Sequence, residues 1–263
     1  MKVKCWLVGV VVLFVVGILV SSSYAKEEGL LLYLSFDEGS GKIAKDSSGN
    51  GNDGNLNGGE LKWVDGKFGK ALQFNGKDTF VEVPYKDMFN LNKGFTLAAW
   101  VKPAVAPFAV EQWRGIINGQ KSTHGPYLLQ MSAAQGEIGA WFGGTWVWNL
   151  TAILIDAKDF WHLVGTYDEN VGFRIYVNGK VDGEQKGPQG VVKDNVKEGV
   201  VIGHNYSFAN RWFDGIIDEA AIYNRALSAN EVVDLYEGRI KGRVTAVQSA
   251  GKLATTWSGI KSR

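Results

Sequence analysis

The sequence predicts an all-β protein, a two-sheet antiparallel jelly-roll sandwich with one short C-terminal helix. Apolar residues alternate along most of the chain after residue 27, a pattern typical of strands that bury one face. Glycine supplies 34 of the 263 residues and tryptophan ten, which favours many tight turns between aromatic strands. Eight or more short strands at this spacing in one domain favour a sandwich.

The first 25 residues have the pattern of a secretory signal peptide. Lys2 and Lys4 precede an apolar run of roughly 16 residues, shorter than the about 20 that a membrane-spanning helix needs. A Ser-x-Ala site ends at Ala25, so we expect cleavage there, with a retained anchor as the alternative. The mature protein is then secreted, extracellular or at the cell surface, or periplasmic, and is not inserted in a membrane.

Removal of this segment also removes Cys5, the single cysteine, so disulfide scaffolds and thiol chemistry are excluded from the mature chain. The formal net charge is +1 for the whole chain and becomes −1 without Lys2 and Lys4. This balance gives no general affinity for nucleic acid. Residues 238–263 are basic and carry no acid, and we expect a weakly ordered tail there.

Strands are expected at eight places within a single domain spanning residues 26–237. Asn178 and Gly179 between two of them predict a tight hairpin, since both residues tolerate positive φ. Ser228 with Glu231 three residues later predicts a capping box and a helix of about two turns, packed near the last strand. The expected strands cover residues 30–36, 71–83, 95–101, 127–131, 161–167, 173–177, 200–202 and 216–223.

Three stretches in this order resemble the laminin-G-like, concanavalin-A-like lectin and glucanase family. The first comprises residues 34–41 (LSFDEGSG), 46–54 (DSSGNGNDG) and 66–76 (GKFGKALQFNG). The second comprises residues 160–168 (FWHLVGTYD) and 173–179 (FRIYVNG), and the third is residues 213–228 (FDGIIDEAAIYNRALS). The resemblance implies two packed curved sheets, export, and recognition of glycans or proteins.

Catalytic chemistry is not expected. Relatives that cleave polysaccharides need two carboxylates across the scissile bond, which one strand face would carry at i, i+2 and i+4. No Glu-x-Asp-x-x-Glu run occurs, and Asp218 and Glu219 are adjacent, so they point to opposite faces. Glu111 and Glu137 are single, and no Gly-x-Ser-x-Gly motif accompanies the three histidines. His162 is expected to be structural, whereas His124 lies in loop-like sequence and is a candidate ligand contact.

Residues 46–54 concentrate oxygen donors in a glycine-rich loop that suits calcium. The resemblance implies a structural Ca²⁺ where the first and last strands meet, held by Asp46 and Asn50 of this loop and by Asp218. A turn closed by local Asx hydrogen bonds is an equal alternative.

A tryptophan-rich hairpin is the most informative segment for binding. A turn at Gly143 and Gly144 would pair Trp141 with Trp146, so that these two side chains and Trp148 share one face. Whether this face is exposed or core stays open, because a slip of one residue inverts it. A second candidate group combines aromatic and polar side chains in a predicted loop: Asn205, Tyr206, Arg211 and Trp212.

These observations favour an exported, non-catalytic module that binds glycan or glycoprotein through stacked rings and hydrogen bonds. One alternative is an adhesion or scaffold protein that contacts proteins or an anionic cell-surface polymer through its sandwich edge or basic tail. The other is a polysaccharide hydrolase or lyase. The sequence does not determine the oligomeric state.

Overall fold

The computed structural model describes residues 27–105, 113–119, 126–133, 135–142, 145–186, 192, 198–206 and 210–240, except the side chain of Trp141. The predicted signal peptide and residues 241–263 of the predicted tail lie outside this part of the chain. Residues 238–240, also assigned to the tail, are described, and Ile240 is buried. No helix within the described part is long and apolar enough to cross a membrane.

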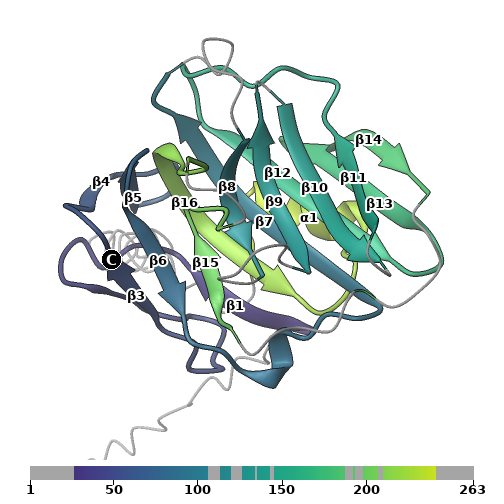
Figure 1. The fold of residues 1–263 in the computed structure, drawn as a ribbon, viewed down its shortest axis with the longest axis horizontal. Helices are drawn as coiled ribbons and strands as arrows, with labels where there is room; N and C mark the ends of the chain where they lie inside the picture. The colour runs from purple at the N-terminus through teal and green to yellow at the C-terminus, as the bar shows by residue number, and fades with distance from the viewer. Residues whose placement is uncertain are drawn as a thin grey trace, which may run out of the picture.

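Two antiparallel sheets of eight strands each form the sandwich, as predicted. In Figure 1, strands β8 to β11 pass in front of β7, β12 and β13, which shows the two layers. Sheet A runs in the order β14 (Lys180–Gln185), β13 (Gly172–Val177), β12 (Trp161–Asp168), β7 (Gly94–Pro103), β16 (Asp214–Tyr223), β5 (Lys70–Asn75) and β4 (Lys62–Asp65), and β1 (Leu30–Leu34) also pairs with β16. Sheet B runs in the order β11 (Thr145–Leu150), β10 (Gln135–Phe142), β9 (Tyr127–Ser132), β8 (Trp113–Asn118), β15 (Val200–Ile202), β6 (Phe80–Val83), β3 (Gly54–Asn57) and β2 (Ile43–Ala44).

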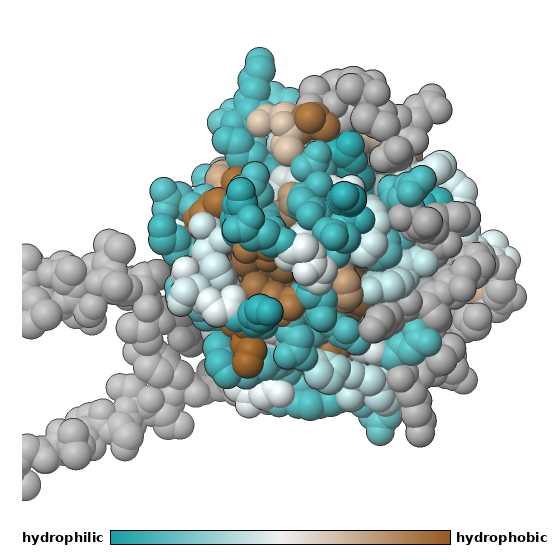
Figure 2. Space-filling model, turned by 60° about the vertical axis from the view of Figure 1, so that its left-hand side comes forward, coloured by the Kyte–Doolittle hydropathy of each residue, from teal (hydrophilic) through white to brown (hydrophobic). Residues whose placement is uncertain are grey.

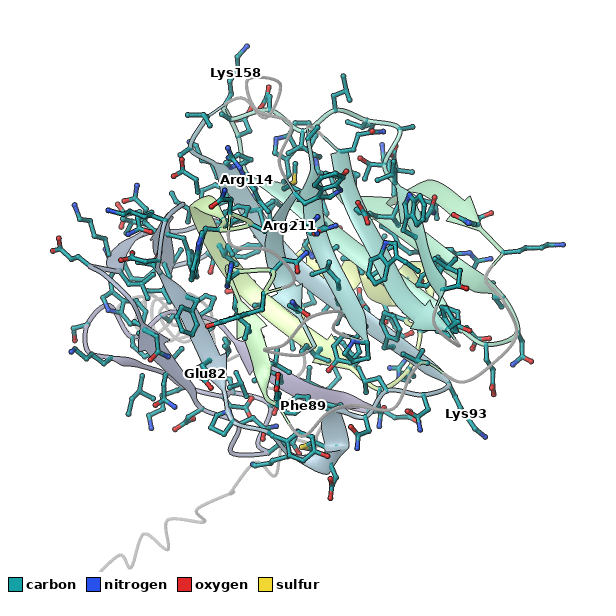
Figure 3. The ribbon with its side chains drawn as sticks, in the orientation of Figure 1. Glu82, Phe89, Lys93, Arg114, Lys158 and Arg211 are labelled. Atoms are coloured by element: carbon teal, nitrogen blue, oxygen red, sulfur yellow. The ribbon has the colours of Figure 1, made fainter. Side chains whose placement is uncertain are left out.

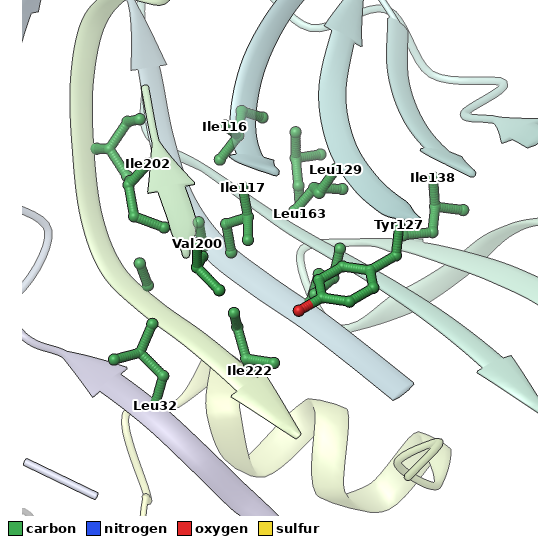
Figure 4. Close-up of a cluster of buried hydrophobic side chains, with 14 of the residues drawn as sticks. Leu32, Ile116, Ile117, Tyr127, Leu129, Ile138, Leu163, Val200, Ile202 and Ile222 are labelled. Carbon is green, nitrogen blue, oxygen red and sulfur yellow. The ribbon is translucent and has the colours of Figure 1, made fainter. Parts of the chain in front are cut away.

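The main core lies between the sheets, because each strand turns its apolar alternate residues inward. Figure 4 shows this cluster: Ile117, Leu129 and Ile138 come from sheet B, whereas Leu163 and Ile222 come from sheet A. The surface in Figure 2 is largely hydrophilic, with a hydrophobic area near its centre. The strand alternation therefore places most of the apolar side chains inside.

Helix α1 (Ala229–Tyr236) covers the outer face of sheet A, and a 3₁₀ helix, η1 (Asp87–Phe89), follows β6. The capping box is present: Ser228 accepts a hydrogen bond from the Glu231 N–H, and the Glu231 side chain accepts one from the Ser228 N–H. Val232 and Leu235 of the helix pack in a second hydrophobic cluster with Tyr33 of β1 and Tyr223 of β16. The predicted helix and its position near the last strand are confirmed.

The predicted hairpin at Asn178 and Gly179 is confirmed, with positive φ at both residues (49° and 79°) between β13 and β14. One strand prediction was wrong. Residues 71–83 form no single strand, because β5 and β6 belong to different sheets. Gly76 adopts φ 68°, and the Asn75 side-chain oxygen accepts hydrogen bonds from the N–H groups of residues 77, 78 and 79, which turns the chain between the sheets.

Candidate functional site

The tryptophan hairpin turns two of its indoles away from the core. Strand pairing places Trp146 opposite Trp141 and Trp148 opposite Gly139, the register expected for a two-residue turn. Ile138 and Ala140, which have the opposite parity on β10, are fully buried between the sheets. Trp146 is therefore half-buried on the outer face of sheet B, and Trp148 is 46% exposed there.

The Trp146 ring lies against Gly139 of β10, a residue without a side chain. A Cβ atom on Gly139 would come within 2.4 Å of Trp146 Cζ2, so the ring occupies the space that any larger residue would fill. The indole N–H also reaches along β10 and hydrogen-bonds to Glu137. Glycine at position 139 and the carboxylate at position 137 together fix the ring.

Glu137 is a buried carboxylate, 4% exposed, at the centre of this face. Burial raises the pKa of its carboxyl, while hydrogen bonds with Gln130, Trp146 and Ser132 act in the opposite direction. The Gln130 side-chain oxygen in turn accepts a hydrogen bond of 2.8 Å from Asn205 Nδ2. A chain of hydrogen bonds therefore connects the tryptophan hairpin to the loop after β15.

Arg211 adds a cation to the same face, near the centre of the view in Figure 3. Its guanidinium carbon lies 4.6 Å from the ring centroid of Trp113, a cation–π contact, and Trp113 is 44% exposed. Burial lowers the pKa of Arg211, and the charge of Glu137 raises it. The Arg211 backbone is fixed as well, because its carbonyl accepts hydrogen bonds from the N–H groups of Gly115 and Asn205, both 3.1 Å long.

A second aromatic group continues this surface toward β6. His204 stacks on Trp212 with a centroid distance of 3.5 Å and an interplanar angle of 5°. Tyr206 meets Phe80 edge-on at 5.7 Å, and Phe80 also contacts Trp212. Tyr206 and Trp212 stay partly exposed, so this face also carries aromatic side chains near β6.

The structure brings together six residues that the sequence analysis assigned to two separate groups: Trp146, Trp148, Asn205, Tyr206, Arg211 and Trp212. The connection runs through Gln130 and Glu137, which link Asn205 to Trp146. Two predicted contacts are not placed, since His124 and the Trp141 side chain lie outside the described residues.

Three functional candidates were missed by sequence reasoning: Trp113, Gln130 and Glu137. Glu137 was set aside because no second acid accompanied it. The sequence does contain a signal for Glu137: it lies four residues before Trp141, so both side chains are on the same face of the strand. Its hydrogen-bond partners are neutral side chains, and the charge that acts on it comes from Arg211. This environment differs from the facing carboxylates of glycoside hydrolysis.

The predicted calcium loop is closed by hydrogen bonds of its own. One carboxylate oxygen of Asp46 accepts from the N–H groups of Tyr33 (3.1 Å) and Ser48 (2.9 Å). The other accepts from the Ser48 hydroxyl (2.8 Å) and the Asn52 N–H (2.8 Å). The side-chain amide of Asn50 donates to the carbonyls of Leu30 and Leu31. The side chains of Asp46 and Asn50, which were predicted to bind calcium, therefore form hydrogen bonds within the protein.

Lysine ammonium groups also occupy neighbouring oxygens. Lys86 Nζ lies 2.9 Å from the carbonyl oxygens of both Asn50 and Gly51. Lys45 Nζ lies 2.6 Å from an Asp53 carboxylate oxygen, and this hydrogen bond lowers the pKa of Asp53. Three oxygens of the loop, from Asn50, Gly51 and Asp53, therefore contact lysine ammonium groups.

Asp218 is bonded elsewhere. It is fully buried, and its Oδ2 accepts from the backbone N–H groups of Lys67 (2.8 Å) and Phe68 (3.1 Å) in the turn between β4 and β5. The described residues contain no group of three or more His, Cys, Asp or Glu suited to a metal. The residues as arranged do not fit a shared calcium site, and calcium binding stays a prediction.

The chain belongs to the concanavalin A-like lectin/glucanases superfamily, whose Laminin_G_3 family model matches residues 75–233. The match covers the end of β5 and all the later strands, β6 to β16. No curated protein sequence matches the chain.

Solved structures share the fold. The binding domain of Paraclostridial Mosquitocidal Protein 1 is 18% identical with a TM-score of 0.64, and the match covers 80% of this chain and 52% of that one. Domain 4 of AbnA, an extracellular arabinanase from Geobacillus stearothermophilus in complex with arabinotriose, is 24% identical with a TM-score of 0.62, covering 80% and 100%. The binding domain of Botulinum neurotoxin DC, in complex with rat synaptotagmin II, is 12% identical with a TM-score of 0.60, covering 81% and 52%. The chain thus spans about half the length of the two toxin domains.

Proposed function

We propose that this protein is an exported, non-catalytic module that binds glycan, free or on a glycoprotein, through the outer face of sheet B. One observation carries the proposal: two exposed indoles, Trp113 and Trp148, flank a buried and fully hydrogen-bonded polar centre at Glu137. Aromatic rings stack on the C–H faces of sugars, and fixed polar groups bond their hydroxyls.

Two structural neighbours support this proposal. Domain 4 of AbnA was solved with arabinotriose, so one module of this fold holds a short sugar chain. Another structural neighbour comes from botulinum neurotoxin type C, and cell entry of that toxin depends on interaction with two ganglioside molecules. Export is supported by the signal-peptide pattern of residues 1–25.

Binding is tested with the mature chain in affinity electrophoresis against soluble polysaccharides and in a glycan array. Trp148→Ala is expected to weaken retardation, whereas Val171→Ala is expected to leave it unchanged. Val171 is the matched control because it is equally exposed, 46%, but lies in the turn between β12 and β13 of sheet A. Retardation that is equal for both variants contradicts the placement of the site.

Two further measurements separate the alternatives. Removal of residues 241–263 is expected to leave glycan binding intact, whereas attachment through the basic tail would disappear and would weaken with salt. Assay of reducing-end release from the same polysaccharides is expected to show no cleavage. Release by the wild-type protein that Glu137→Gln abolishes would identify an enzyme instead.

A further inference from the structure

Trp113 and Trp148 of the proposed glycan site lie at the two ends of a diagonal across four strands of sheet B. Trp113 on β8 pairs with Ser132 on β9, which pairs with Gln135 at the start of β10. Four residues further along β10, Gly139 supports the Trp146 ring and pairs with Trp148 on β11. The line from Trp113 to Trp148 therefore crosses three strand spacings and four residue steps.

The distance between Trp113 and Trp148 follows from this register and from the geometry of a β-sheet. Strands lie about 4.8 Å apart and rise about 3.4 Å per residue, so the two backbone positions are roughly 20 Å apart. A single sugar ring covers about one indole, and it cannot contact both Trp113 and Trp148. Both indoles contribute to one ligand only when that ligand is a chain of several sugars lying along the diagonal.

The groups between the two indoles are polar but carry no net charge. Glu137 and Arg211 compensate each other, since each acts electrostatically on the other. Gln130 and Asn205 are joined amides. A charged sugar bound over this centre therefore gains no net electrostatic attraction from it. The hydroxyl groups of an uncharged sugar need none.

We propose that the outer face of sheet B binds an uncharged glycan in extended form, with several consecutive sugars along the diagonal from Trp113 to Trp148. This inference rests on the proposed function and specifies the class of its ligand. Trp113 and Trp148 contact sugars at opposite ends of the bound segment, and the partly exposed side chains of Trp146 and Arg211 contact the sugars between them.

The test begins with affinity electrophoresis of the mature chain against arabinan, arabinoxylan, xyloglucan, mixed-linkage β-glucan and galactomannan, with polygalacturonate and heparin as acidic probes. Linear oligosaccharides of one to eight sugars, cut from the polymer that binds, are then titrated by calorimetry. We expect affinity to increase about tenfold or more from the disaccharide to the hexasaccharide and then to level off. We also expect equal affinity at low and high salt.

Two variants place the ends of the bound chain. Trp113→Ala and Trp148→Ala are each expected to weaken hexasaccharide binding roughly three- to tenfold, the loss of one stacked ring. Each is expected to affect the disaccharide less. Because both side chains are about half exposed, circular dichroism should show an unchanged fold, and Val171→Ala serves as the control.

Each contrary result has its own meaning. Equal affinity for one sugar and six overturns the extended chain but leaves the proposed glycan function standing. Salt-sensitive binding to the acidic probes alone overturns the uncharged ligand and again leaves glycan binding standing. Failure to bind any polymer or array glycan overturns both proposals.

Discussion

Trp146 hydrogen-bonds through its indole to the buried carboxylate of Glu137, on the strand that pairs with its own. This contact joins a solvent-facing aromatic ring to a group that is 4% exposed. An exposed tryptophan on a free strand would rotate about its side-chain bonds. Here the ring is held by Gly139 beneath it and by Glu137 beside it, so the surface is ordered before a ligand binds.

Replacement of Glu137 by leucine is expected to destabilise the protein by roughly 1–3 kcal/mol, because the donors of Gln130, Ser132 and Trp146 lose their acceptor. Urea unfolding followed by circular dichroism measures the change. Glu137→Gln keeps one acceptor oxygen and should recover part of the stability and of the glycan affinity. Unfolding of Glu137→Leu at the wild-type urea concentration would show that the hydrogen bonds contribute little.

Stability is expected to decrease with acidification because of His162. The ring is fully buried beside Trp100 and Tyr236, and burial, with a smaller contribution from the Lys67 charge, lowers its pKa from 6.5 to about 3. Below pH 6.5 the unfolded chain binds a proton that the folded chain excludes until about pH 3. Protonation of this group therefore costs no stability well above pH 6.5, and it costs about 2 kcal/mol at pH 5.

Urea unfolding at pH 7.5 and pH 5 tests this effect in the wild type and in His162→Phe, which keeps a ring in the cluster but cannot be protonated. The loss of stability between the two pH values should be about 2 kcal/mol smaller in the variant. An equal loss in both proteins would assign the acid sensitivity to other groups.

Calcium is expected to have little effect on the melting temperature, since Lys86 already contacts the carbonyl oxygens of Asn50 and Gly51. Scanning calorimetry with Ca²⁺ and with EDTA measures this. Lys86→Met keeps most of the aliphatic chain and removes the ammonium. We expect the free energy of unfolding to fall by only about 0.5–1 kcal/mol, since the lost hydrogen bonds are exposed to solvent. A rise in the wild-type melting temperature with Ca²⁺ would instead support the metal predicted for this loop.

The capping box at the start of α1 is expected to contribute to the free energy of unfolding. Ser228→Ala removes the acceptor for the Glu231 N–H and should lower the free energy of unfolding by about 1 kcal/mol. Asn230→Ala, an exposed position in the first turn of the same helix, is the control and should change it little. A smaller loss in Ser228→Ala than in the control would contradict the capping role.

Much of the fold was predictable because its signals are local. The capping box needs four consecutive residues, and the turn at Asn178 and Gly179 needs two residues that accept positive φ. Alternation of apolar residues predicted a strand over residues 161–167, and β12 spans Trp161–Asp168. The break at Gly76 was missed because the alternation continues through it, and only the change of sheet distinguishes β5 from β6.

The site was predicted in pieces. Strand parity grouped Trp146 with Trp148, but it could not decide which face is buried, because that depends on the opposite sheet. The packing of Val147 against the core settles the direction. The link from Gln130 to Asn205 spans 75 residues of sequence, and no local pattern encodes it.

Burial of Leu30 and Ile240 in the cluster under α1 has a consequence for how the module is attached. Both ends of the described domain leave from the helix-covered back of the sandwich, opposite the tryptophans of sheet B. A tether or a neighbouring domain joined at either end therefore begins on the α1 side of sheet A. The face that carries Trp113 and Trp148 then points away from whatever the module is attached to.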